Sequence, residues 1–223
     1  MSEILEAVPE PLRLILGSSA QARSAYISHL ISTILVNRVF TPFLFGLHGQ
    51  SQETATLLTD VSEKLRAKSA HREAFWRQQT LLAAYTTAHA KLHMNKEAGK
   101  VVDEMVNAIT PFCSVEEEGI QIRAAVRQVV KMAVETWRYV RLERERIEAS
   151  MPEGQPPDEE LAEDMWLPVE SVTPRNMQDR GKAVLALFPV IHREPVQEGL
   201  CTNEHECRDR GCVYSKGFAF YMG

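Results

Sequence analysis

The chain has 223 residues, 44% hydrophobic and 25% charged, a composition that is typical of a folded globular domain and excludes collagen-like and wholly disordered chains. Its net charge of -5 is unevenly placed, since residues 1–150 hold 18 basic and 17 acidic side chains while residues 151–223 hold 7 and 13. A near-neutral body lacks the basic surface on which sequence-independent nucleic-acid binding depends, so we expect no nucleic-acid partner.

Neither a secretion signal nor a membrane span is predicted in the first part of the chain. The opening residues, MSEILEAVPEPLRLILGSS, are acidic and contain prolines where a signal peptide would be basic. The longest apolar-rich stretch, residues 26–47, is interrupted by His29, Arg38 and Pro42, which a span of about 20 apolar residues would not contain. We therefore expect a soluble protein of the cytoplasm or nucleus, with reduced cysteines and no membrane association.

Two amphipathic helices are predicted first, over residues 19–39 and 52–68. Ser18 or Ser19 is a suitable N-cap for the first helix, and Pro42 ends it. In both helices apolar side chains recur every three or four positions, as on one helix face. They are Ala22, Tyr26, Leu30 and Ile34 in the first helix and Leu57, Leu58, Val61 and Leu65 in the second.

Three further helices are predicted over residues 71–94, 96–110 and 115–149. The last places a broad apolar arc, from Ile122 to Ile147, beside a basic strip. The basic strip consists of Arg123, Arg127, Lys131, Arg138 and Arg141. One interpretation is a solvated face whose charges are paired with Glu135, Glu143 and Glu145. The other is a docking surface for an acidic partner, including the acidic tail of the chain itself.

The composition changes sharply after residue 150, where MPEGQPPDEELAEDMW combines prolines with a run of acids. This change predicts an acidic, proline-rich linker over residues 151–180, between a helical bundle at residues 1–150 and a tail at residues 181–223 that packs back on the bundle. In the tail, AVLALFPVI at residues 183–191 is typical of a buried strand, with a two-turn helix ending at Phe188 as the alternative. GFAFYMG at residues 217–223 is a candidate partner for that strand.

Motifs of the common enzyme classes are absent from the sequence. It contains no phosphate-binding glycine loop, no dinucleotide-binding fingerprint, no HExxH motif and no GxSxG elbow. His89 and His93 share one face near the end of the predicted third helix, but without a carboxylate at helical spacing we expect solvated side chains and not a metal site. Trp76 and Trp137 each precede an arginine, and we expect core packing with the arginine reaching solvent. No catalytic, cofactor-binding or metal-binding residue is assigned.

Three of the four cysteines lie close to a histidine in CTNEHECRDRGC, residues 201–212. Cys201, His205, Cys207 and Cys212 could close a tetrahedral zinc site, with Cys113 and His192 as replacements for a poor ligand. The single residue between His205 and Cys207 is tight for zinc modules, and a reducing compartment disfavours disulfides. We therefore expect a polar loop with reduced cysteines and no cofactor, and keep zinc as the alternative, followed by redox and thiol chemistry.

Four stretches carry a resemblance to known proteins: VFTPFLFGL, FWRQQTLLAAY, AVRQVVKMAVETWR and VLALFPVIHREP. In their texture they resemble uncharacterised helical proteins of filamentous fungi. The resemblance covers most of the chain but concerns packing residues. It implies a helical fold and a fungal source, and it implies no activity.

Together these patterns predict a mainly α fold, a multi-helix bundle with a short irregular C-terminal tail that contains a small β element. A bundle with mixed surface charge and no convergent polar cluster offers surfaces for binding, so we expect a non-enzymatic interaction or regulatory protein with a protein partner. The alternatives are an enzyme or small-ligand binder with a pocket between helices, and a zinc-stabilised C-terminal module.

Overall fold

The computed structural model describes residue 16 and residues 19–46, 52–113, 119–151, 166–169, 183–196 and 211–221. These residues form five α-helices, followed by six short strands in two small sheets. The predicted class, a mainly helical bundle with a small C-terminal β element, is confirmed. None of the helices in this part of the chain is long and apolar enough to span a membrane.

Helix α3 (Ala20–Leu35) begins after Ser19, whose Oγ accepts a hydrogen bond of 3.2 Å from the backbone N–H of Ala22. The serine satisfies an N–H that the first helical turn leaves without a partner, so the predicted N-cap is confirmed. A π-helical turn (Val36–Phe40) continues α3 to the predicted end. Pro42 follows shortly after and cannot extend the helix, because proline has no N–H to donate.

Helix α4 (Gln52–Lys68) has the predicted bounds, but the two helices after it do not. Helix α5 (Ala70–Thr86) and helix α6 (Ala88–Ile109) meet at Thr87, so the predicted boundary at residue 95 is wrong. The backbone of Thr87 is extended, and its Oγ1 accepts a hydrogen bond of 3.1 Å from the N–H of Ala90. This threonine therefore caps α6, and residues 88–94 belong to α6 and not to α5.

Helix α7 (Gly119–Val140) is shorter than the predicted 115–149. The buried guanidinium of Arg77 on α5 donates to the carbonyls of Arg141, Glu143 and Arg144 at 2.5, 2.9 and 3.1 Å. Carbonyls that would accept from the next helical turn are thus bonded to a side chain, and the helix ends. Residues 147–150 form a strand instead, so Ile147 does not belong to the helical arc in which we placed it.

The strands form two three-stranded sheets. Residues 183–193 contribute one strand to each sheet, and so do residues 212–221. The first sheet has the order β1 (Ile147–Ser150), β4 (Val190–Arg193), β5 (Cys212–Ser215), all antiparallel. The second has the order β2 (Trp166–Val169), β6 (Gly217–Tyr221), β3 (Ala183–Phe188), in which β6 is parallel to β2 and antiparallel to β3. The predicted strand at 183–191 and its pairing with GFAFY are therefore confirmed. Pro189 divides that strand into β3 and β4, since it cannot donate to a ladder.

One segment of the predicted linker is also a strand, because β2 lies within residues 151–180. The rest of the linker, apart from residue 151, falls outside the described residues. The division of the chain at residues 150 and 180 remains a prediction.

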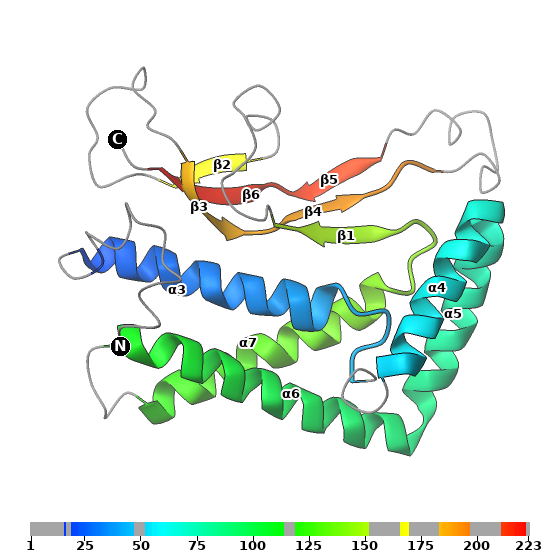
Figure 1. The fold of residues 1–223 in the computed structure, drawn as a ribbon, viewed down its shortest axis with the longest axis horizontal. Coiled ribbons are helices and arrows are strands. Elements are labelled where there is room, and N and C mark those ends of the chain that lie inside the picture. The colour runs from blue at the N-terminus through cyan, green and yellow to red at the C-terminus, as the bar shows by residue number, and fades with distance from the viewer. Residues whose placement is uncertain are drawn as a thin grey trace.

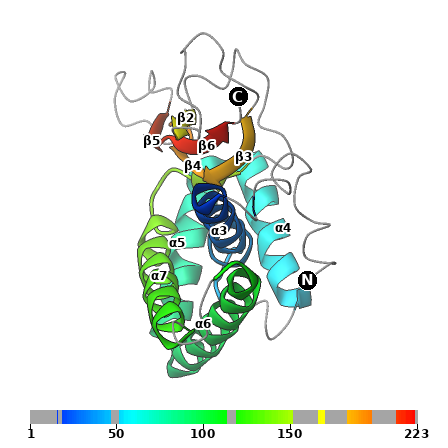
Figure 2. The same cartoon turned by 90° about the vertical axis from the view of Figure 1, so that its left-hand side faces the viewer.

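The elements are stacked in layers, as Figures 1 and 2 show. The strands lie over α3, and α3 lies between the strand layer and the pair α6 and α7, while α4 and α5 stand across one end. One apolar cluster joins α3 to the second sheet through Tyr26, Leu185 and Phe220. A larger one joins α6 to α7 around Met105 and Val130. Because each fully buried aliphatic or aromatic side chain contributes about 1.5–3 kcal/mol, these two clusters hold the layers together.

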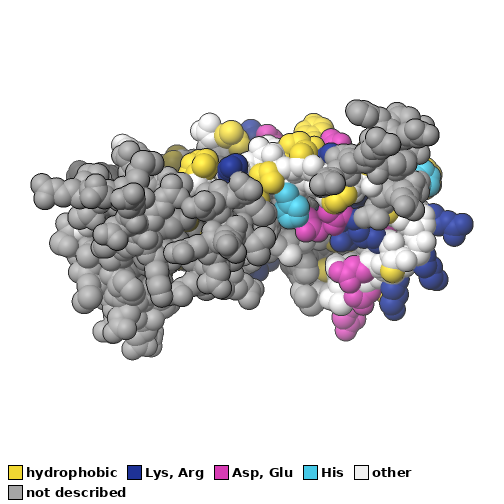
Figure 3. Space-filling view, turned by 90° about the horizontal axis from the view of Figure 1, so that it is seen from above, with side chains coloured by type: hydrophobic (Ala, Val, Ile, Leu, Met, Phe, Trp, Pro, Cys, Tyr) yellow, Lys and Arg dark blue, Asp and Glu magenta, His cyan; other side chains and the backbone are white. Residues whose placement is uncertain are grey.

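The outer face of the strand layer carries side chains of every kind. Seen from above in Figure 3, hydrophobic side chains are interspersed with acidic, basic and histidine side chains. Strand β5 is exposed along its length and contributes Val213 and Tyr214. This face has no single charge sign among its described residues, in contrast to the groove on the helical side.

Candidate functional site

The largest hollow described in the helical part of the structure is a groove between α6 and α7, with a volume of about 590 Å³. The end of α5 closes it with Tyr85. Its floor is apolar and comes from both helices, with Met94, Ala98 and Val102 from α6 and Val130 and Val134 from α7. We call this hollow the α6–α7 groove.

Small residues explain why the two helices leave space here. On α6, Ala98 and Gly99 face the groove, and a Cβ built on Gly99 would meet no atom within 4 Å. Helix α6 also presents Leu92 to solvent, with 66% of its surface exposed. Leu92 and Gly99 are seven residues apart and therefore share one helix face, so the apolar surface continues past the edge of the groove.

Four basic side chains and one acidic side chain line the same groove. They are Lys91, Arg127, Lys131, Arg138 and Glu135. Lys131 and Glu135 are 4.0 Å apart and both well exposed, so their pairing is weak. Among the described residues Lys91 and Arg127 have no ion-pair partner, which leaves the groove with an excess of positive charge.

Arg138 lies at the closed end of the groove against two aromatic rings. Its guanidinium carbon is 5.5 Å from the centre of the Tyr85 ring and 5.3 Å from that of Tyr139. Both distances are within the range of cation–π attraction. Burial raises the pKa of Tyr85, against the opposing effect of the charges of Arg141 and Arg138. The phenol therefore stays neutral and serves as a hydrogen-bonding group.

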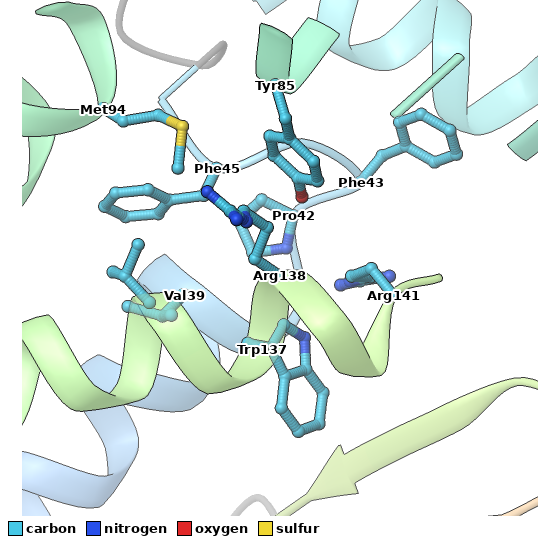
Figure 4. A pocket seen from close by; sticks show the side chains of 10 residues that line it. Val39, Pro42, Phe43, Phe45, Tyr85, Met94, Trp137, Arg138 and Arg141 are labelled. Carbon is cyan, nitrogen blue, oxygen red and sulfur yellow. The ribbon is translucent and has the colours of Figure 1, made fainter. Parts of the chain in front are cut away.

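Beyond Arg138 the groove continues into a small recess, shown in Figure 4. Phe43, Phe45 and Trp137 surround it, and the Tyr85 hydroxyl points into it. Its volume of about 10 Å³ is enough for about one water molecule. The recess thus makes a rigid end wall, because its aromatic side chains are packed and buried.

The basic strip of the sequence is only partly a single surface. Arg127, Lys131 and Arg138 line the groove together, as a docking strip requires. Arg123 instead pairs with Asp103 of α6 at 2.6 Å. Arg141 lies beyond the end of α7 and donates to the carbonyls of Phe40 and Thr41. Of the expected glutamate partners, Glu135 pairs within the strip and Glu145 pairs with Arg144.

The two tryptophans pack in the core as predicted, but the arginine beside Trp76 does not reach solvent. Trp137 is 5% exposed and donates from Nε1 to the carbonyl of Phe40 at 2.9 Å, and Trp76 packs against Phe43. Arg77 is only 3% exposed and is held by Glu73 and by carbonyls, so the expectation of an exposed arginine is wrong there. Glu73 and Arg77 are buried charged residues that the sequence pattern did not single out.

The histidine pair lies at the opposite end of a helix from the one expected. His89 and His93 belong to the first turns of α6, because α6 begins at Ala88. Their expected position near a helix C-terminus is therefore wrong.

The structure places only one ligand of the proposed zinc cluster. Cys212 begins β5 and is exposed, whereas Cys201, His205 and Cys207 lie outside the described residues. Of the replacement ligands, Cys113 donates from Sγ to the carbonyl of Ile109 at 3.4 Å, and His192 faces Glu148 at 3.8 Å. Among the described residues no three histidine, cysteine or acidic side chains are grouped as a metal site. The expected polar loop and the zinc alternative both remain predictions.

No protein-family model, no curated protein and no solved structure matches this chain. The resemblance to fungal helical proteins therefore stays a prediction. A proposal on function has to be argued from the residues of this chain themselves.

Proposed function

We propose that this protein is a non-enzymatic interaction protein whose α6–α7 groove binds a short acidic, amphipathic segment of a protein partner. The observation that carries the proposal is the combination of an apolar floor with four basic side chains and one acidic one. The partner is a protein of the cytoplasm or nucleus, as the composition and the expected reduced cysteines favour.

The dimensions and chemistry of the groove suit a helical segment. An amphipathic helix binds a groove through apolar side chains at positions i, i+3, i+4 and i+7, and the floor of Met94, Ala98 and Val134 offers apolar surface for them. Acidic side chains along the edges of such a helix would meet Lys91 and Arg127, which have no described ion-pair partner. Charge complementarity of this kind sets the association rate and the choice of partner.

A binding role is favoured by the apolar side chains of the groove floor and the basic side chains along its edges. The alternative of a small-ligand binder uses the same groove, and the experiment below separates the two.

The experiment measures binding of a labelled peptide of about 14 residues, or four helical turns, with leucines at i, i+3, i+4 and i+7 and glutamates elsewhere. We expect saturable binding by fluorescence anisotropy that weakens with added salt, because the rim charges are exposed. The double variant Arg127→Gln/Lys131→Gln should bind about tenfold more weakly, since each exposed charge contributes about 0.2–1 kcal/mol.

Arg123→Gln is the matched control, because it removes the same kind of charge from α7 at a side chain that is paired with Asp103. It should leave peptide affinity within about twofold of the wild type. A peptide with the same composition but scattered leucines should bind no better than background. Equal affinity of the double variant and the control would overturn the proposal.

Deletion of residues 151–223 is not a clean test of docking by the chain's own tail. The deletion would also remove β3 and β6 from the apolar face of α3. The charge variants avoid this problem because Arg127 and Lys131 are exposed residues of α7.

A further inference from the structure

A second cavity lies between the turn after α3, helix α4 and strand β1. Its volume is about 310 Å³. Phe40 and Phe43 give it an aromatic wall, and Thr59 and Ser62 of α4 contribute hydroxyls. None of these residues lines the α6–α7 groove itself, although Phe43 and Arg141 also line the small recess beyond its end.

Four arginines gather around this cavity, and two of them are already neutralised. Arg77 pairs with Glu73 at 2.9 Å, and Arg66 pairs with Glu194. Glu73 also accepts a hydrogen bond of 2.8 Å from the Ser62 hydroxyl. The charges of Arg66 and Arg77 are therefore already paired with carboxylates and are not available to a ligand in the cavity.

The other two arginines, Arg141 and Arg146, line the cavity and form no ion pair with any described residue. Arg141 donates from Nη2 to the carbonyls of Phe40 and Thr41, while its Nε is buried without a hydrogen-bond partner in the described structure. Arg146 donates to the Ser62 hydroxyl at 3.2 Å. Arg141 and Arg146 are half-buried. Guanidinium groups that are partly withdrawn from water are normally matched by carboxylates, so two unmatched ones in one cavity call for an anion.

The pKa of the Arg141 guanidinium also favours an anion in this cavity. Burial first, and then the charges of Arg146 and Arg77, lower its pKa to about 10, against the opposing effects of Tyr85 and Glu148. The side chain is still charged at neutral pH, yet its environment opposes the charge. An oxyanion between the two arginines would relieve that opposition.

Acidic side chains lie toward the solvent side of the same cavity. Glu63 is exposed, and the side chain of Glu148 is 47% exposed, with His192 at 3.8 Å from its carboxylate. The two cations that line the cavity are therefore less accessible to solvent than its two anions. A dianion such as phosphate would meet both acids, whereas a ligand with charges of both signs would match both ends.

We infer that this cavity binds a small amino carboxylate, with the carboxylate between Arg141 and Arg146 and the ammonium group toward Glu63 and Glu148. An apolar side chain on the ligand would pack against Phe40 and Phe43. The volume is at the lower end of the range for small-molecule pockets, which suits a ligand of amino-acid size.

The test uses L-leucine as the probe and the melting temperature of the full chain as the readout. We expect the melting temperature to rise with leucine concentration, because a ligand that binds only the folded state stabilises it. N-acetyl-L-leucine and L-leucinamide each lack one of the two charges, and each should need about tenfold more ligand for the same rise.

Two variants and one control make the result specific. Arg146→Gln should abolish the leucine effect. Glu148→Gln changes an exposed side chain, and it should reduce the preference for leucine over N-acetyl-L-leucine. Arg127→Gln removes an arginine from the α6–α7 groove and should leave the leucine effect unchanged.

The inference is overturned if leucine does not raise the melting temperature, if Arg146→Gln responds as the wild type does, or if inorganic phosphate stabilises the protein better than leucine. Failure of the peptide experiment on the α6–α7 groove would leave these outcomes untouched, because that experiment changes Arg127 and Lys131, which do not line the second cavity.

Discussion

At the scale of single residues, Glu73 and Arg77 connect three parts of the molecule. Glu73 is fully buried and accepts from Ser62 of α4 and from Arg77 one turn later on α5. Arg77 also donates from its Nη1 and Nη2 groups to carbonyls that follow α7. One ion pair thus fixes where α7 ends and where β1 begins.

Glu73→Gln is expected to lower the free energy of unfolding by about 3–5 kcal/mol, because the buried charge of Arg77 would lose its counter-ion. Urea denaturation followed by circular dichroism measures the loss. Glu104→Gln is the control, since its pair with Arg38 is exposed on both sides and should contribute less than about 1 kcal/mol. Similar losses for the two variants would show that the Glu73 pair does not stabilise the fold.

At the scale of elements, sequence periodicity identified the helices better than it identified their ends. The bounds of α4 were predictable because its apolar spacing stops at a polar stretch. The end of α7 was not, because it depends on a side chain 64 residues away, and the spacing of apolar residues carries no information about that contact. At Thr87 the apolar pattern continues across the break, so only the capping tendency of threonine could have indicated it.

The candidate site, like the helices, was predictable from the sequence only in part. One wall of the groove, with Arg127, Lys131 and Arg138, was present in the basic strip. The other wall comes from α6, and only the packing of the two helices brings it opposite α7. The cavity itself could not be found from periodicity. Arg141 was placed in the basic strip but lies in the turn after α7, and Arg146 directly precedes β1.

Gly99 allows the groove to be closed without disturbing the helix that forms it. Gly99→Leu adds a side chain where a Cβ meets no atom, and it replaces glycine by a good helix former. We expect the variant to be more stable by about 0.5–1 kcal/mol and yet to lose binding of the acidic peptide. Thermal unfolding and anisotropy measure these two opposite effects.

Gly119→Leu is the matched control, because the Cβ at Gly119 also meets no atom within 4 Å but lies at the start of α7, outside the groove lining. It should keep the affinity of the wild type. Unchanged peptide binding by Gly99→Leu would exclude the groove as the binding site.

At the scale of the whole molecule, apolar packing and polar contacts hold the strand layer on the helices, and one of these polar contacts joins α3 to β3. His29 of α3 donates from Nδ1 to the carbonyl of Ala186 in β3, at 2.7 Å. Burial lowers the pKa of His29, against the smaller effect of that hydrogen bond. The neutral imidazole is therefore the form that the folded layers favour.

Because the pKa of His29 is lower in the folded state than in the unfolded chain, its contribution to stability is complete above the ordinary value of about 6.5 and is lost as the pH falls through the folded value. His29→Asn keeps a donor for Ala186 and removes the titration. The difference in melting temperature between wild type and variant should shrink between about pH 8 and about pH 5. A constant difference across that range would contradict the assignment.

The position of β6 also affects how the chain is made. This strand lies between β2 and β3, although both precede it in the sequence. On the ribosome, β2 and β3 therefore emerge before the strand that joins them, and the face of α3 around Tyr26 emerges earlier still. Helices α3 to α7 can form from local contacts in the meantime, since such contacts need little chain. Completion of the strand layer is thus a late step of biosynthesis, and until then an apolar helix face remains open to other proteins in the cell.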